Sequence, residues 1–536
     1  MTDRHFSLAD LFELVADTVP DRLALVAGSE RRTFAELDER STRLANHLVA
    51  RGIGPDDKVA IYSWNRAEWI EAMFAAWKAR AVPININYRY VADELRYVLE
   101  NADVRAVVFE RSFAPLLDTV APDLPLVSHR IVLEDGSDAE VGDAVPYEEA
   151  VASASPERPG MERSADDLYM LYTGGTTGMP KGVMWRQEDI FFAAMGGGGF
   201  GEPPIETPEE IVGRVKPEAE RMISMALAPV MHGAAQWGLC ITLFGGGTAL
   251  LYTGHHFDPH EVWKIVEAER ANSVMVVGDA MARPLAEALA EPGTSYDTSS
   301  VFSVGSGGAV FSTAVKDQLR EQLGEVLIID TFGASELGAG GSSLDPDRGL
   351  RFAASPSMSV LDEDFCPVEP GSGQRGLLAR RGHIPIGYYK DEAKTAATYV
   401  TDPDGVRWAI PGDFALIEAD GTITLLGRGS GCINTGGEKV YPEEVEAALK
   451  SHPDVFDALV VGLPDERFGE RVAAVIAPRP GRTPSLDDVA AHCRTKVAGY
   501  KVPREVRLAE TIGRTPAGKP DYAWARELLA TRGDDS

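Results

Sequence analysis

Apolar and polar positions along the chain follow two periods, which predict helices and strands in alternation. Apolar side chains spaced three and four residues apart predict an amphipathic helix at residues 34–48, and residues 69–79 show a similar pattern. Short apolar runs at 58–62 and 106–109 are typical of buried strands. Strands that alternate with helices in this way indicate a parallel α/β sheet.

The longest stretch without a charged side chain lies between Met222 and Asp258. Its hydropathy resembles that of a membrane span, but it is interrupted by Pro229, His232, Gln236 and a run of three glycines. These residues favour a buried helix plus a strand, and we expect no integral membrane segment.

A third apolar run, residues 168–172, leads into a segment rich in glycine and threonine. Glycines allow consecutive backbone N–H groups to point at one place, which makes a nest for anions. Hydroxyl groups and one lysine add further donors, and the combination predicts a polyphosphate site. Its residues are Thr173, Gly174, Gly175, Thr176, Thr177, Gly178 and Lys181. Taken alone, the segment also fits a flexible glycine turn.

Two familiar nucleotide motifs fail on their context. The loop at 173–182 is not a Walker A motif, because Pro180 precedes its lysine and no serine or threonine follows it. Residues 196–201 satisfy G-x-G-x-x-G, but no strand leads into them and Glu202-Pro-Pro follows where a helix should begin. We interpret them as a flexible turn before an acidic surface segment that ends near residue 221.

Length and charge limit the class of protein further. A chain of 536 residues is too long for one hydrophobic core and predicts at least two domains. Its formal net charge of −30 argues against nucleic acid or an anionic membrane as a partner. The N-terminus lacks an apolar signal segment, and four widely spaced cysteines are typical of reduced thiols, so we expect a cytoplasmic protein.

The segment Tyr-Thr-Gly-Gly-Thr-Thr-Gly-Met-Pro-Lys-Gly, residues 172–182, resembles the phosphate loop of the adenylate-forming enzymes, which include acyl-CoA synthetases, luciferases and peptide-synthetase adenylation domains. Gly174 stands where that family usually has serine. Further motifs follow in family order across residues 30–525. The resemblance implies an α/β fold with a large N-terminal domain (1–428) of mainly parallel sheets and a small distorted β-barrel. A small, mobile α+β C-terminal domain (429–536) would complete it.

The same resemblance implies the nucleotide site. Gly305-Ser-Gly-Gly-Ala309 looks like the adenine-side turn of the family, and residues 330–336, Asp-Thr-Phe-Gly-Ala-Ser-Glu, look like its Tyr-Gly-x-Thr-Glu motif. Phe332 would stack on adenine, Ser335 would contact the α-phosphate, and Glu336 would bind Mg²⁺. The remaining residues that it implies are Gly307, Gly308, Ala309, Asp330 and Gly333 for the nucleotide, Asp413 for the ribose, Arg428 at the domain junction, and Thr173 as a second Mg²⁺ ligand. Without the resemblance, we would interpret Glu336 as an ordinary surface acid.

C-terminal motifs imply a two-step reaction with ATP and CoA. Arg514-Thr-Pro-Ala-Gly-Lys519 matches the family's Pro-x-Gly-Lys tail, and Lys519 would bridge the carboxylate and the α-phosphate during adenylation. The C-terminal domain would then rotate about a hinge at 429–431, where Gly431 replaces the usual Asp or Lys. Gly436 and Gly437 would line the channel for the CoA thiol. Outside this set of motifs, Lys519 would be a solvated loop lysine.

The acyl substrate is expected to be a hydrophobic carboxylate. His232 lies at a position where the family commonly gates the acyl tunnel, although a lone histidine on an apolar segment is more often a core residue. The aspartate that binds an amino group in amino-acid-activating relatives is missing between residues 222 and 257. The glycine-rich insert and residues 429–441 resemble an actinobacterial subgroup that acts on very-long-chain or steroid side-chain acids.

Three alternatives stay open at the level of sequence. A ligase that loads a carrier protein and a luciferase-like oxygenase would share every motif, whereas a non-catalytic nucleotide-binding protein would not need both Glu336 and Lys519. The oligomeric state is also open, with a homodimer among the possibilities.

Overall fold

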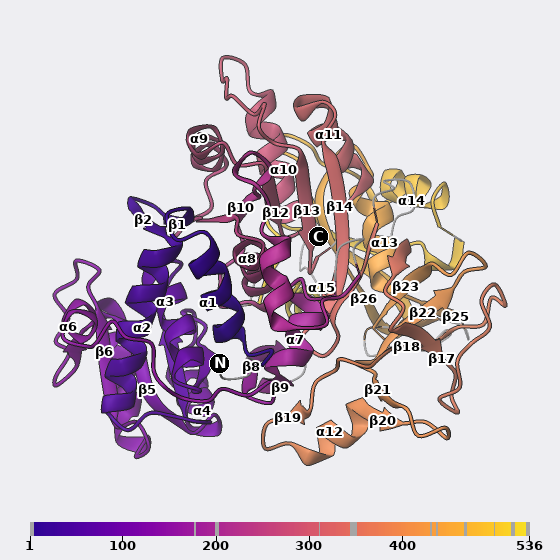
Figure 1. The fold of residues 1–536 in the computed structure, drawn as a ribbon. Helices are drawn as coiled ribbons and strands as arrows, with labels where there is room; N and C mark the ends of the chain where they lie inside the picture. Colours follow the sequence, from indigo (N-terminus) through magenta and orange to yellow (C-terminus); the bar gives the residue numbers. More distant parts are fainter. Residues whose placement is uncertain are drawn as a thin grey trace.

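The computed structural model describes most of the chain, in eleven segments. These are residues 5–175, 178–198, 203–309, 311–343, 351–428, 431, 433–435, 438–465, 469–497, 499–515 and 520–531. Within them, residues 174–175, 178, 428, 434, 438–439 and 469 are described only in their backbone. Figure 1 shows the first 150 residues on the left of the molecule and the C-terminal strands and helices on the right. Within the described residues, no helix is both long and apolar enough to cross a membrane.

A five-stranded parallel sheet forms the first part of the fold, in the order β4-β3-β5-β6-β7. The strands are β3 (Lys58–Tyr62), β4 (Val82–Asn85), β5 (Val104–Glu110), β6 (His129–Leu133) and β7 (Val145–Pro146). The helices that accompany it are α2 (Phe34–Ala50), α3 (Ala67–Lys78), α4 (Ala92–Asn101), α5 (Ala114–Val120) and α6 (Tyr147–Ala152). A capping box between Thr33 and Glu36 fixes the start of α2. The predicted parallel α/β arrangement is confirmed.

A larger sheet begins with six strands whose neighbours are parallel, in the order β1-β11-β10-β12-β13-β14. They are β1 (Leu23–Ala27), β10 (Ile223–Ala226), β11 (Thr248–Leu251), β12 (Ser273–Val276), β13 (Ser303–Gly307) and β14 (Leu327–Ala334), and β2 (Glu30–Thr33) pairs antiparallel with β1. The helices of this region are α1 (Leu8–Thr18), α8 (Gly233–Phe244), α9 (Pro259–Glu269), α10 (Gly278–Ala290) and α11 (Thr313–Leu323). The uncharged stretch that starts at Met222 therefore becomes β10, α8 and β11.

The same sheet continues with antiparallel strands beyond β14. Their order is β15-β16-β23-β22-β18-β21-β20, with β17 paired to β18. The strands are β15 (Gly338–Ser343), β16 (Arg351–Ala354), β17 (Met358–Leu361), β18 (Gly376–Arg381), β20 (Tyr399–Thr401), β21 (Arg407–Ala409), β22 (Asp413–Ile417) and β23 (Ile423–Arg428). Helix α12 (Glu392–Thr398) leads into β20.

A separate three-stranded antiparallel sheet has the order β19-β9-β8. Strands β8 (Leu168–Gly175) and β9 (Gly178–Arg186) form a hairpin, and β19 (Gly387–Tyr388) pairs with β9. Helix α7 (Gln187–Ala194) follows β9 directly. The acidic segment after α7 is only partly on the surface, because Ile205 and Ile211 are buried in the main core.

The C-terminal part has a sheet of its own, in the order β25-β24-β27-β26 with β28 paired to β27. The strands are β24 (Ile433–Thr435), β25 (Glu438–Val440), β26 (Val455–Asp465), β27 (Gly469–Pro478) and β28 (Glu505–Leu508). Helices α13 (Pro442–Lys450) and α14 (Leu486–Arg494) bury their apolar residues in one cluster with this sheet, and α15 (Tyr522–Ala530) packs in a second cluster. This α+β arrangement agrees with the expectation.

Two contacts join the C-terminal part to α10. Arg479 Nη1 lies 3.1 Å from the Glu287 carboxylate, and the Arg283 guanidinium lies 5.5 Å from the centre of the Phe456 ring. Arg283 is fully buried and keeps a hydrogen bond of 3.4 Å to Asp279. The burial of Arg283 therefore depends in part on the C-terminal part lying where it does.

Candidate active site

The predicted phosphate loop forms the end of the β8–β9 hairpin. Thr173 pairs with Lys181 across the two strands, and Gly175 pairs with Gly178. The hairpin was not predicted, because only the run before the loop was interpreted as a strand. Thr176 and Thr177 lie outside the described residues, and for Gly174 only the backbone is described.

Lys181 makes an ion pair with Asp391, which precedes α12. This hydrogen bond lowers the pKa of the Asp391 carboxyl. Asp391 also caps α12 by accepting from the Lys394 amide at 2.9 Å. The position of the loop lysine is therefore set by the segment that contains β19.

Asn85, at the end of β4, ties the nucleotide loop to the expected acyl site. Its side-chain amide donates to the carbonyls of Tyr172 at 2.8 Å and Met231 at 2.7 Å. Its side-chain oxygen accepts from the Tyr172 amide at 2.8 Å. Because Asn85 is buried, water does not satisfy its side-chain amide, and these bonds supply the hydrogen-bond partners that it needs. One side chain thus holds the strand that leads into the loop and the residue before His232.

His232 is half-buried and stands at the N-cap position of α8. The helix brings Gln236 and Trp237 to Tyr169 of β8. The Tyr169 hydroxyl donates to the Gln236 side chain at 2.9 Å and accepts from the Trp237 indole at 3.2 Å. This buried polar chain joins α8 to the phosphate-loop hairpin next to His232, whose gating role stays a prediction.

The predicted adenine-side turn lies at the carboxyl end of β13, beside β14. Gly307 is in register with Thr331, and a Cβ atom at Gly307 would lie 2.8 Å from the Thr331 hydroxyl oxygen. Gly308 has a φ of +83°, a conformation that favours glycine. The strand is Ser303–Gly307, and the bend at Gly308 and Ala309 follows it directly.

The next motif lies at the end of β14 and in the turn that follows it. Strand β14 continues through Ala334, so that Phe332 and Gly333 lie within a β14–β15 hairpin. The Asp330 carboxylate forms a buried ion pair with Lys316 at 2.9 Å. Burial raises the pKa of Asp330 although Lys316 opposes the change. The Phe332 ring lies against the Gly340 backbone, where a Cβ atom would come within 2.3 Å of it.

The turn that carries Ser335 and Glu336 is held from the three-stranded sheet. The Tyr388 hydroxyl of β19 donates to Glu336 Oε1 at 2.8 Å, and the Trp185 indole of β9 donates to the Ser335 carbonyl at 3.0 Å. Glu336 is half-buried. The phosphate loop and this turn therefore share one scaffold.

Ribose-side and hinge residues are described in part. Asp413 begins β22 and lies opposite Arg428 in β23, of which only the backbone is described. Gly431 is described, and a Cβ atom there would meet only Pro442, at 4.0 Å. Gly436 and Gly437 lie outside the described residues. No role at these positions is tested by the structure.

Lys519 also lies outside the described residues, but both ends of its loop are described. Arg514 and Pro520 form an antiparallel bridge, and the Arg514 guanidinium makes an ion pair with Asp457. Asp457 also binds Lys450 at 3.0 Å. Burial raises the pKa of Asp457, but Lys450 and Arg514 outweigh it and hold the pKa below its usual value. The base of the predicted catalytic loop is therefore fixed by charge.

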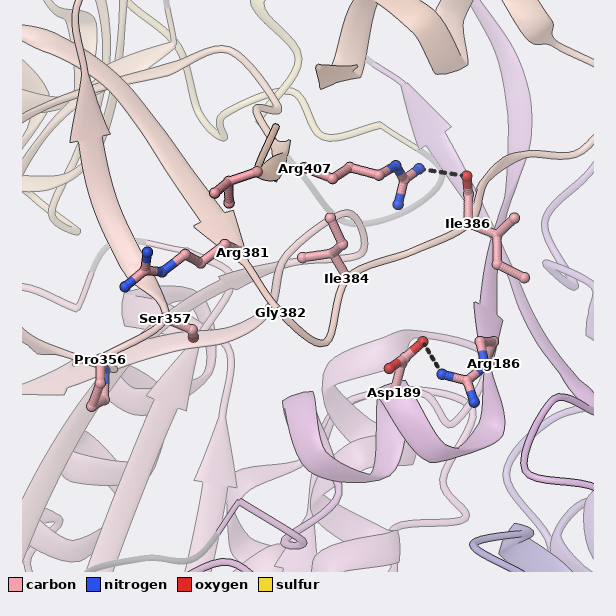
Figure 2. Close-up of a pocket in the computed structure, with 10 residues that line it drawn as sticks. Arg186, Asp189, Pro356, Ser357, Arg381, Gly382, Ile384, Ile386 and Arg407 are labelled. Carbon is pink, nitrogen blue, oxygen red and sulfur yellow. Dashed lines mark hydrogen bonds and ion pairs between the residues drawn. The ribbon is translucent and has the colours of Figure 1, made fainter. Parts of the chain in front are cut away.

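One open hollow, shown in Figure 2, has a volume of about 880 Å³. Its walls include Arg186, which binds Asp189, and Arg407, which donates to the Ile386 carbonyl. None of the residues that line it is a predicted site residue. The predicted site residues therefore lie outside this hollow.

Several residues of the site were missed from sequence. Tyr388 and Asp391 lie far from the predicted motifs along the chain, and Trp185 lies in β9, a strand that the sequence does not predict. Asn85 had a visible signal, because it is a polar side chain at the end of the otherwise apolar run Val82-Pro-Ile. Among the described residues, no cluster of three metal-binding side chains occurs.

Family models match most of the chain. The model "AMP-binding enzyme" covers residues 12–389, and "AMP-binding enzyme C-terminal domain" covers residues 444–519. The chain belongs to the AMP-binding enzyme family. This match and the relatives that are named CoA ligases confirm the expectation of an AMP-forming acid–thiol ligase that uses ATP and CoA.

Curated relatives are similar over nearly the whole length. The 3-oxocholest-4-en-26-oate–CoA ligase of Rhodococcus rhodochrous is 48% identical over 541 residues, which is 99% of this chain and 97% of that protein. A medium/long-chain-fatty-acid and 3-oxocholest-4-en-26-oate CoA ligase of Mycobacterium tuberculosis strain H37Rv is also 48% identical, with 99% and 97% coverage. The medium-chain acyl-CoA ligase Mig of Mycobacterium avium is 41% identical, with 98% of each chain covered.

Solved structures confirm the fold class. The anthranilate CoA ligase AuaEII, in complex with anthranoyl-AMP, has a TM-score of 0.84 at 22% identity and 98% coverage of both chains. ATP-bound MatB from Rhodopseudomonas palustris has a TM-score of 0.80 at 25% identity, with 97% and 99% coverage.

Proposed function

We propose that this protein is a CoA ligase for hydrophobic carboxylic acids, with steroid side-chain acids and medium- to long-chain fatty acids as its substrate class. The observation that carries the proposal is the 48% identity, over 99% of the chain, to ligases named for these acids. The uncharged segment that forms β10, α8 and β11 supports it, because that segment offers no carboxylate to bind a substrate amino group.

In the first step, a carboxylate oxygen of the substrate attacks the α-phosphorus of ATP. The bond to the β-phosphate bridging oxygen breaks, and pyrophosphate leaves. We assign the β8–β9 loop with Lys181 to the phosphates, Gly307–Ala309 and Phe332 to adenine, and Asp413 to the ribose. Ser335 would contact the α-phosphate, and Lys519 would bridge it to the substrate carboxylate. Such a transfer depends mainly on positioning and electrostatics.

The donor set at Glu336 fits Mg²⁺. Tyr388 donates to Oε1 of Glu336 and so fixes a half-buried carboxylate. Thr173 of the loop strand would add a hydroxyl oxygen. Mg²⁺ prefers one or two carboxylates together with substrate phosphates, so no larger cluster of protein ligands is needed. The bound ion would offset the negative charge that develops on the leaving pyrophosphate.

In the second step, the CoA thiol gives up its proton, and its thiolate attacks the carbonyl carbon of the acyl-adenylate, so that the bond to AMP breaks. We propose that residues 429–536 act as the mobile domain and rotate about residues 429–431, which withdraws Lys519. Gly436 and Gly437 would then line the thiol channel. Free thiols at Cys240, Cys366 and Cys493 agree with the cytoplasmic location that we propose.

Pyrophosphate release tests the proposal. Purified protein is given ATP, Mg²⁺ and a panel of acids, with and without CoA: a steroid side-chain acid, fatty acids of several lengths, and an amino acid. We expect CoA-dependent turnover on the steroid or longer fatty acids and none on the amino acid. Turnover without CoA, with AMP ester accumulating, would indicate a carrier-loading ligase. Light or O₂ consumption would indicate the luciferase-like alternative.

A further inference from the structure

Arg380, on β18, is a buried cation that has no carboxylate partner within the described part of the chain. Arg380 is only 5% exposed, and burial lowers the pKa of its guanidinium to about 10. Burying a charge costs several kcal/mol unless hydrogen bonds compensate it. Its neighbour Arg381 is exposed and lies over the Trp408 ring.

The hydrogen bonds of Arg380 go to backbone carbonyls just after the Ser335–Glu336 turn and at the end of α7. Nη1 donates to Leu337 at 2.6 Å and to Ala339 at 2.7 Å, with the carbonyl of Ala193 at 3.4 Å. Ala193 lies in the last turn of α7, where the helix dipole favours a cation. Leu337 follows Glu336 directly.

Gly338 lets the turn close around the guanidinium. It has a φ of +69°, and a Cβ atom there would lie 3.2 Å from Arg380 Nη1 and 2.9 Å from the Ala193 Cβ atom. The backbone on both sides of Gly338 can therefore direct two carbonyls at the same nitrogen. A neutral side chain at position 380 would remove this donor from the carbonyls of Leu337 and Ala339.

We propose that Arg380 is a positioning residue for the Ser335–Glu336 turn and thereby for the adenylation half-reaction. Three contacts from three strands hold this turn: Trp185 of β9 on the Ser335 carbonyl, Tyr388 of β19 on the Glu336 carboxylate, and Arg380 of β18 on the carbonyls that follow. The inference rests on the proposed function, because it assumes that Glu336 serves adenylation. It adds the residue that fixes the C-terminal side of the turn.

A purely structural role would predict a different result from a positioning role. If Arg380 only stabilises the fold, its loss affects both half-reactions alike. If it positions Glu336, the loss falls on adenylation, since thioester formation from a finished acyl-adenylate releases no pyrophosphate. The two half-reactions therefore separate the roles.

The experiment compares Arg380→Met, Arg380→Lys and the control Arg381→Met, below their melting temperatures. Acyl-adenylate formation is measured from pyrophosphate release in single turnover, and thioester formation is measured with supplied acyl-adenylate and CoA. We expect Arg380→Met to slow adenylation about a hundredfold, as loss of a preorganised donor does, and thioester formation less than threefold. Lysine should restore about a tenth of the adenylation rate, and Arg381→Met should change neither rate more than about twofold.

Equal losses in both half-reactions, or no loss in either, would overturn the inference. If Arg380→Met does not fold, Arg380→Lys decides by the same criterion. Failure of the proposed function is a separate outcome, because the unaltered protein would then form no acyl-adenylate with any acid of the panel.

Discussion

The Tyr388 hydroxyl donates a hydrogen bond of 2.8 Å to the carboxylate of Glu336, 52 residues earlier in the chain. Tyr388 lies in a two-residue strand that pairs with β9, the strand that carries Lys181. The proposed ligand of Mg²⁺ and the proposed ligand of the phosphates are therefore held by one small sheet. A change in the contacts of this sheet should therefore reduce the rate of adenylation more than it reduces the stability of the fold.

Tyr388→Phe removes this hydrogen bond and keeps the ring. We expect adenylation to slow about tenfold and to require more Mg²⁺ for half-maximal rate, because a charge-assisted hydrogen bond contributes about 1.5–3 kcal/mol. Pyrophosphate release across a Mg²⁺ titration measures both effects. The matched control is Tyr389→Phe, since that hydroxyl donates to Asp103 at 2.7 Å and not to the turn. Similar losses in the two variants would contradict the assignment of Glu336.

Lys519→Ala should abolish adenylation and spare thioester formation from supplied acyl-adenylate. The ammonium group is proposed to act only while the carboxylate and α-phosphate are both charged, and loss of such a donor costs a hundredfold or more in rate. Single-turnover assays of the two steps measure this. Lys501→Ala is the control in the same domain, because Lys501 pairs with Glu444 at 2.6 Å. Comparable loss in both steps would refute the role of Lys519.

Asp457→Asn tests the base of the Lys519 loop. The variant keeps the volume but weakens the ion pairs with Arg514 and Lys450, so the bridge between Arg514 and Pro520 should loosen. We expect adenylation to fall at least tenfold, together with a lower melting temperature. Asp454→Asn, a partly exposed position in the loop before β26, should leave both unchanged. A full adenylation rate in Asp457→Asn would show that the loop needs no such support.

Glu446 predicts a dependence of stability on pH. Burial raises the pKa of this carboxyl from 4.5 to about 7, so the folded state binds a proton that the unfolded state has released. Its contribution to the free energy of unfolding is complete below pH 4.5 and is lost as pH rises through about 7, by up to about 1.4 kcal/mol per pH unit. Denaturant unfolding at pH 5.5 and 7.5 should show a smaller difference for Glu446→Gln than for the unaltered protein. An equal difference would contradict the prediction.

Glu287→Lys places two cations opposite each other where Arg479 now meets Glu287. The resulting repulsion should disfavour the observed position of the C-terminal part. We expect the rates of the two half-reactions to change in opposite directions, with their ratio shifted about threefold to tenfold. The double variant Glu287→Lys, Arg479→Glu reverses the pair and should restore the ratio. Parallel changes in both rates would show that this contact does not select between domain positions.

Sequence reasoning predicted the elements whose signal is local. The period of residues 34–48 gave α2, and the apolar run at 58–62 gave β3. It missed β9, an element that depends on its partner strand β8. A glycine-rich segment has no apolar period of its own, so pairing decides its conformation.

The site was predicted as a set of motifs but not as an arrangement. The motif order identified Glu336 and Lys181 as candidates, yet the contacts that hold them come from residues far away in sequence, such as Tyr388 and Asp391. Arg380 is one of two adjacent arginines, and the sequence does not show which of them is buried. Which of two adjacent side chains is buried depends on how the sheets pack, and neither periodicity nor motif spacing predicts that packing.

The side chain of Asn85 connects the segment proposed to bind ATP with the segment proposed to bind the acid. It holds the backbone of Tyr172, before the nucleotide loop, and the backbone of Met231, before the expected acyl gate. A ligand that orders one of these segments lowers the cost of ordering the other, and by thermodynamic linkage the effect is reciprocal. Acid and ATP should therefore each tighten the binding of the other, and Asn85 is where this cooperativity would be lost.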